Sequence, residues 1–353
     1  MKTKQKAVRS STRKPAAKIK TLKEITIFPD QEQQYTGSKE SVMLARIVNG
    51  ENLEQVSENT ILFPALLSNL TPSLSDVSRR NGMYVGRQLY SMLKSSNKYI
   101  MYEESVADLV RFFEHSGYTR ITYNIFPDRI DLHMYDNSHE YIGIDLHSFE
   151  AGLISGFLTA AKKQYVDVTE HECSNNGSEY CKFTSLHDPY RQQSQRDAKA
   201  SILRFVDHVT KRTEQLEKKQ LVRIAPEYYM LAMSTVLDRP YQEEIQHVAS
   251  YIGSEIGMRL FTSERTRTSR SAISRIERVM NLLNLGKTTV RSLYPVKIEI
   301  SFDKLHSKHE FVELAIAFIN GLLKNHAIEG ASVTRETRRG AYIVNISGKK
   351  IGK

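Results

Sequence analysis

The stretch Glu170-His171-Glu172-Cys173-Ser174-Asn175-Asn176-Gly177-Ser178-Glu179-Tyr180-Cys181 decides how the rest of this chain is interpreted. It contains both cysteines of the protein, separated by seven residues, with a carboxylate three positions before the first. Asn176-Gly177 between two β-prone runs is a strong signal for a tight turn, so the two thiols are expected to converge on the arms of one hairpin. Upstream, His147 precedes an apolar helical pattern and can bring an imidazole to the same place.

The residue types in this stretch are those of a metal site. One His, one Glu and two Cys would form a closed tetrahedral zinc site that leaves no position for a substrate water, so its role would be structural. The predicted ligands are His147, Glu170, Cys173 and Cys181. A Cys173–Cys181 disulfide or two buried, inert thiols would also explain the cysteine spacing, but neither explains Glu170 or His147.

The pattern Glu-x2-Cys-x7-Cys, with Gly177 between the cysteines, resembles the signature of the vinyl-4-reductase-type domain, a small-molecule-binding module. This domain occurs in the aromatic-sensing regions of some bacterial activators and in many archaeal proteins. The resemblance covers about residues 64–188 and implies zinc held by the Glu, both Cys and one residue further upstream. That residue is His147 here, where the familiar sensors use Cys.

The resemblance also implies a ligand pocket between the sheet and the helices, with the metal hairpin as one wall. Phe126, Phe157 and Tyr165 are the candidate ligand-binding residues, chosen from the placement of aromatic side chains alone. The expected ligand is small and hydrophobic or aromatic.

Two stretches of the chain show the same order of helical and strand patterns, which indicates a tandem duplication. The apolar positions of the first two helical patterns are Val85, Leu89, Met92, Val106, Leu109, Val110 and Phe113, and their counterparts are Ile252, Ile256, Leu260, Ile276, Val279, Met280 and Leu283. We therefore expect an α+β fold of two tandem units, each with helices packed on a mainly antiparallel sheet. The alternative is that the two stretches match without a duplication, because any two α+β stretches share such coarse signals.

The expected second unit lacks the metal ligands, because Ser332 and Arg335 stand opposite Glu170 and Cys173. The expected organisation is a disordered basic tail at 1–23, an irregular arm at 24–59, the zinc unit at 60–190, a connecting amphipathic helix at 191–222, and the metal-free unit at 223–350. Within the arm, residues 25–28 can add a strand. The connecting helix would either pack on the two units or form a short coiled-coil contact.

The composition of the 353 residues, 40% hydrophobic and 25% charged, is typical of a soluble globular protein with room for two cores. The sequence has no apolar run long enough for a membrane span and no hydrophobic centre near its N-terminus, so we expect a cytoplasmic protein with reduced thiols. It has no Gly-rich phosphate loop, nucleophile elbow or HExxH motif, so we do not expect an enzyme.

The net charge of +10 is concentrated at the N-terminus. Residues 1–23 contain no acidic residue, and the rest of the chain has 41 basic and 40 acidic residues. The basic residues of the tail are Lys2, Lys4, Lys6, Arg9, Arg13, Lys14, Lys18, Lys20 and Lys23. Such a tail favours DNA, RNA or an anionic membrane surface, although it can also be a solubilising extension with no specific partner.

Two functions follow from these patterns. The first is a non-enzymatic zinc protein that senses or carries a small ligand in its first unit, as a monomeric pseudo-dimer or a homodimer. The alternative is a nucleic-acid-associated or assembly protein in which the folded units are scaffold and the tail supplies the affinity.

The alternative function predicts a steep salt dependence. If the tail binds nucleic acid, deletion of residues 1–23 removes most of the affinity, and the intact chain loses affinity as salt rises because counterions are released from the phosphates. Fluorescence anisotropy with labelled DNA and RNA at several salt concentrations measures both effects. Binding that persists without the tail, or that does not change with salt, would exclude this role.

Overall fold

The computed structural model of the chain describes residues 39–50, 53–57, 59–96, 101–118, 120–135, 146–185, 198–215, 221–234, 236, 239–261, 269–293, 296–302, 309–324, 328–338 and 341–350. The basic tail and the expected strand at 25–28 lie outside these residues. Within them the fold is α+β, with small antiparallel sheets and many helices, as the sequence predicts.

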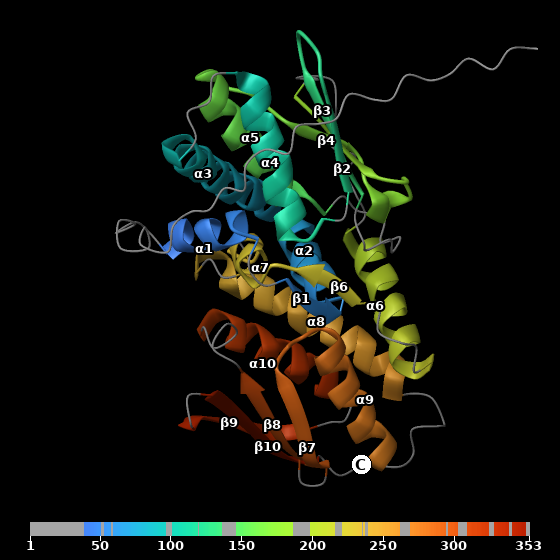
Figure 1. Ribbon diagram of the computed structural model, residues 1–353. Helices are drawn as coiled ribbons and strands as arrows, with labels where there is room; N and C mark the ends of the chain where they lie inside the picture. Colours follow the sequence, from blue (N-terminus) through green and yellow to red (C-terminus); the bar gives the residue numbers. More distant parts are fainter. Residues whose placement is uncertain are drawn as a thin grey trace, which may run out of the picture.

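The first sheet has four antiparallel strands in the order β2-β3-β5-β4. Their bounds are Arg120–Ile125 for β2, Ile130–Tyr135 for β3, Thr169–Glu172 for β4 and Cys181–Thr184 for β5. Three helices lie on one side of this sheet (Figure 1): α3 (Pro72–Ser96), α4 (Tyr102–Ser116) and α5 (Ser148–Lys162). The two hairpins β2–β3 and β4–β5 therefore meet where β3 pairs with β5.

The second sheet has the corresponding order, β7-β8-β10-β9, and lies at the opposite end of the molecule (Figure 1). Its strands are β7 (Lys287–Leu293), β8 (Val296–Phe302), β9 (Ile328–Arg338) and β10 (Ala341–Lys350). The accompanying helices are α8 (Gln242–Phe261), α9 (Ser269–Leu282) and α10 (His309–Leu323).

The helical periodicity of the sequence is confirmed by burial. All fourteen apolar positions named for the first two helical patterns of each stretch are buried. Gly117 follows α4 with φ +120° and Gly286 follows the end of α9 with φ +94°, a region of backbone conformation that glycine enters without a steric penalty.

Helix α2 (Asn59–Asn69) lies between the two ends and is buried on nearly every side. Its Phe63 ring stacks on Phe205 with 5.8 Å between centroids and meets the Phe318 ring edge-on at 5.6 Å. Phe205 belongs to α6 (Ala198–Gln215), the predicted connecting helix, whose apolar face is buried within the chain. Among the described helices none is long and apolar enough to cross a bilayer.

The segment expected to be an irregular arm is partly ordered. It contains α1 (Lys39–Val48) and β1 (Glu54–Ser57), and β1 pairs with β6 (Leu221–Ile224) in a separate two-stranded sheet. The expected domain boundary at residue 223 thus falls inside a strand. Local sequence patterns missed this pairing because its two partners are far apart along the chain.

After β6 the chain continues into α7 (Pro226–Ala232), which packs on α1 and α3, and a short 3-10 turn at Arg239–Tyr241 precedes α8. The amide of Ala225 donates to the carbonyl of Ser116 at 3.0 Å. Residues 221–232 therefore pack against the first half of the molecule, although the sequence predicted them as part of the connecting helix and the second unit.

Helices α3 and α5 approach each other through glycines. A Cβ at Gly86 of α3 would overlap the carbonyl oxygen of Leu153, and one at Gly156 of α5 would overlap that of Met83. The second half has the same kind of contact, with Gly253 of α8 against Phe318 and Gly321 of α10 against Ser250. These positions bring two helix backbones together and leave no space for a side chain.

Gly86→Ala is expected to destabilise the protein by about 1–3 kcal/mol, because the added methyl group forces α3 and α5 apart. The direction of this change in stability is informative, because Ala in place of Gly normally stabilises a helix by about 1 kcal/mol. Chemical denaturation measures the change. Arg87→Ala, at the exposed neighbouring position, is the control and should leave stability nearly unchanged. A Gly86→Ala protein as stable as the parent would contradict the close approach.

Candidate metal centre

Three elements bring the predicted ligands together. His147 occupies the position just before α5, and its carbonyl accepts the first helical hydrogen bond from the amide of Ala151 at 2.9 Å. Glu170 lies in β4, Cys173 directly follows that strand, and Cys181 begins β5. The predicted hairpin with a thiol on each arm is therefore confirmed.

The connection between the two strands is longer than the two-residue turn that Asn176-Gly177 suggests. A 3-10 turn spans Ser174–Asn176, and Gly177 follows it with φ +94°. The carbonyl of Cys173 accepts hydrogen bonds from the amides of Asn176 at 3.0 Å and Ser178 at 3.2 Å. These bonds fix the backbone of Cys173 beneath the turn.

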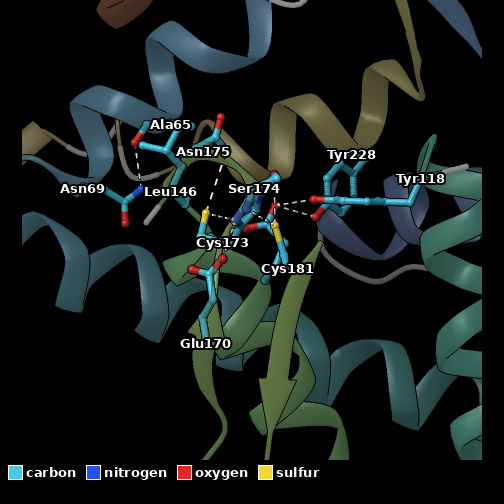
Figure 2. Close-up of polar contacts among 12 residues, drawn as sticks. Ala65, Asn69, Tyr118, Leu146, Glu170, Cys173, Ser174, Asn175, Cys181 and Tyr228 are labelled. Carbon is cyan, nitrogen blue, oxygen red and sulfur yellow. Dashed lines mark hydrogen bonds and ion pairs between the residues drawn. The ribbon is translucent and has the colours of Figure 1, made fainter. Parts of the chain in front are cut away.

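The potential ligand atoms of His147, Glu170, Cys173 and Cys181 all lie within 4.8 Å of one another. His147 Nδ1 is 2.8 Å from Glu170 Oε1 and 3.5 Å from Cys173 Sγ. All four residues are buried, and the two cysteines are only 1% exposed. Figure 2 shows the side chains of Glu170, Cys173 and Cys181 pointing toward one another from the hairpin. This group can hold a metal ion.

Both sulfur atoms also have neighbouring donors. The amide of Ser174 donates to Cys181 Sγ at 3.3 Å, and the Ser174 hydroxyl lies at the same distance. Asn175 Nδ2 is 3.9 Å from Cys173 Sγ. Hydrogen bonds of this kind orient metal ligands and spread the charge of thiolates. The turn therefore supplies a second layer of contacts around the four ligands.

Burial makes negative charge costly in this group. It raises the pKa of the Glu170 carboxyl, and it raises the pKa of Cys173 well above that of an ordinary thiol. The hydrogen bond that Cys173 donates lowers the pKa of Cys181. A carboxylate and two thiolates in this place need a cation to offset their charge, which a divalent metal supplies.

The donor set fits zinc. Zinc bonds of about 2.3 Å to sulfur and 2.0–2.1 Å to nitrogen place tetrahedral ligand atoms roughly 3.3–3.8 Å apart. To reach that geometry, His147 Nδ1 and Glu170 Oε1 would move apart from 2.8 Å, and the atoms that lie up to 4.8 Å apart would move closer by about 1 Å. Both cysteines are free thiols, so the disulfide alternative is not what the structure contains. With four protein ligands the set is closed, which favours a structural ion over a catalytic one.

The three aromatic residues predicted to bind a ligand differ in their exposure. Phe126 is 38% exposed, with the guanidinium of Arg129 4.3 Å from its ring centroid, and Tyr165 is 63% exposed in a surface depression. Phe157 is fully buried and packs edge-on against Tyr90 as part of the core. Phe157 thus belongs to the core, and the assignment of Phe126, Phe157 and Tyr165 as ligand-binding residues stays a prediction.

A cavity of about 70 Å³ lies next to the metal group instead. It lies between α2, the start of α5 and the segment from β6 to α7, and His147 and Asn175 contribute to its wall. Its other polar residues include Asn69, Tyr118, Glu150 and Tyr228, none of which the sequence singled out. Glu150 offered no signal, since a carboxylate in the first turn of a helix is ordinary.

No family model, no curated protein and no solved structure matches this chain.

Loss of one ligand should disrupt the centre. Cys173→Ser is expected to remove the metal and to destabilise the protein by about 3–5 kcal/mol, because the remaining buried ligands lose the cation that offsets their charge. Elemental analysis of the purified protein and thermal unfolding measure the two effects.

A matched pair of carboxylate variants tests the same point. Glu170→Gln should lose metal, whereas Glu172→Gln, two residues along the same strand but exposed, should retain it. Equal metal content in both variants, or none in the parent protein, would show that the group is not a metal site.

Proposed function

We propose that this chain is a non-enzymatic, zinc-stabilised binding protein built from two units of the vinyl-4-reductase type. The observation that carries the proposal is the buried group of His147, Glu170, Cys173 and Cys181 at the base of the β4–β5 hairpin. A closed set of four protein ligands stabilises a fold and offers no open position for catalysis. Zinc would hold a hairpin whose strands are only four residues long.

The proposed duplication is supported by two correspondences between the halves. In both sheets the four strands lie in the same order, with the fourth strand along the chain between the second and the third. The glycine contact between α3 and α5 also recurs between α8 and α10, with Gly86 and Gly253 following equivalent Tyr-apolar pairs in the sequence. A duplicated chain can pair its own two units, so a monomer satisfies the proposal as well as a homodimer does.

The proposed binding function places a small ligand in the first half, beside the metal hairpin. The family resemblance favours a hydrophobic or aromatic ligand. The cavity of about 70 Å³ is smaller than the roughly 150 Å³ in which one benzene is held in a protein core. An aromatic ligand would therefore require the cavity to widen.

The identity of the fourth ligand gives the test of this proposal. His147→Cys should retain one zinc per chain, since thiolate replaces imidazole in the ordinary zinc ligand sets, whereas His147→Ala should lose it. Inductively coupled plasma mass spectrometry on protein from zinc-replete cells measures the content. Retention of zinc by His147→Ala, or loss by both variants, would refute the proposed ligand set.

A further inference from the structure

The cavity beside the metal hairpin contains a buried carboxylate. Glu150 lies on α5 one turn after His147 and is only 7% exposed. Its Oε1 accepts hydrogen bonds from the hydroxyls of Tyr228 at 2.8 Å and Tyr118 at 3.2 Å. Figure 2 shows both tyrosines directing their hydroxyls toward the same centre. A carboxylate has about four lone-pair sites, so these two bonds leave acceptor capacity unused.

Two asparagines, Asn69 and Asn175, line the same cavity. Asn69 Oδ1 and Asn175 Oδ1 are buried, and within the part of the chain that the structure describes neither has a hydrogen-bond partner. The orientation of Asn69 is fixed, because its Nδ2 donates to the carbonyls of Ala65 at 2.7 Å and Leu146 at 3.0 Å. Buried acceptors without a partner are costly, so a ligand or water must meet them.

Several hydrogen-bond donors in the wall are already engaged. Ser68 Oγ donates to the carbonyl of Pro64 at 2.9 Å, and Ser116 Oγ donates to that of Phe112 at 2.7 Å. Tyr118 and Tyr228 donate to Glu150. Burial raises the pKa of Tyr228 well above its ordinary value, so that its hydroxyl stays protonated. The cavity therefore presents acceptors and one carboxylate, which suits a donor-rich cation and disfavours an anion.

We propose that this cavity binds a small organic cation with several N–H groups, of the ammonium or guanidinium class. Its N–H groups would donate to Glu150, Asn69 and Asn175 would contribute to the polar part of the lining, and its carbon atoms would contact the apolar wall formed by Ile61 and Met233. The volume of about 70 Å³ is less than half of the roughly 150 Å³ that holds one benzene, which limits the ligand to a few heavy atoms. The exposed Arg223 in the lining adds a repulsive charge that favours a small cation over a multiply charged one.

This inference goes beyond the proposed function, because it assigns to the proposed small-molecule site a small cation where the resemblance favours a hydrophobic or aromatic ligand. It depends on the metal only through Asn175, which belongs to the metal hairpin. Zinc content and cation binding are separate measurements, so either one can fail while the other succeeds.

The test compares two ligands of the same shape. Guanidinium and urea are both planar with four heavy atoms, but only guanidinium is charged. Isothermal titration of the full-length protein, at constant chloride and at ligand concentrations in the low millimolar range, should give saturable binding of guanidinium. Urea should bind at least about tenfold more weakly, since a hydrogen bond to a charged group is stronger than one between neutral groups.

Glu150→Gln removes the charge and keeps the shape, so it should weaken guanidinium binding at least about tenfold. Glu114→Gln, an exposed carboxylate on α4, is the matched control and should bind as the parent does. If Glu150→Gln does not fold, the inference is tested by the ratio of guanidinium to urea affinity in the parent protein.

Guanidinium and urea binding equally, or no saturable binding of either, would show that the cavity holds water only and would overturn the inference. Zinc is measured on the same preparation. A zinc-containing protein that ignores guanidinium refutes the ligand class alone, and a zinc-free protein that binds guanidinium refutes the proposed metal role alone.

Discussion

The meeting of His147, Glu170, Cys173 and Cys181 is the interaction on which the first half of this protein depends. It joins the start of α5 to the β4–β5 hairpin, two segments that otherwise share few contacts. Three of its members are costly to bury as anions, and a divalent ion converts that cost into a bond between the segments. The ion would therefore set both the position of the hairpin and the direction in which α5 begins.

The same helix start also determines the cavity. His147 and Glu150 are three residues apart, so one turn of α5 directs an imidazole to the metal group and a carboxylate to the neighbouring space. Asn175 makes the corresponding link from the hairpin, because its amide nitrogen lies near Cys173 Sγ and its residue contributes to the cavity wall. Helix α5 is in turn fixed against α3 by glycine contacts, so a movement of the hairpin would change the cavity before it changed the core.

The sequence predicted the features that depend on short-range order. Glu170, Cys173 and Cys181 occupy one hairpin, so their convergence follows from spacing and turn residues, and His147 was found because it precedes an apolar helical run. The helices and the strands were predicted from the period of their buried positions. The β1–β6 pairing and the cavity were missed, because both depend on which distant segments pack together. The exposure of Phe126 and Tyr165 could not be predicted for the same reason, since hydrophobic character along a strand or loop does not determine burial.

The difference in strand length between the β4–β5 and β9–β10 hairpins explains why the first half would need a metal and the second would not. Strands β4 and β5 have only four residues each. Strands β9 and β10 have 11 and 10 residues and pair along most of that length. A long ladder supplies enough backbone hydrogen bonds and cross-strand contacts to hold a hairpin, whereas a short one is marginal in water. An ion held by the four side chains of the first sheet would therefore offset the shortness of the β4–β5 ladder, whereas the β9–β10 ladder is long enough to hold its hairpin without one.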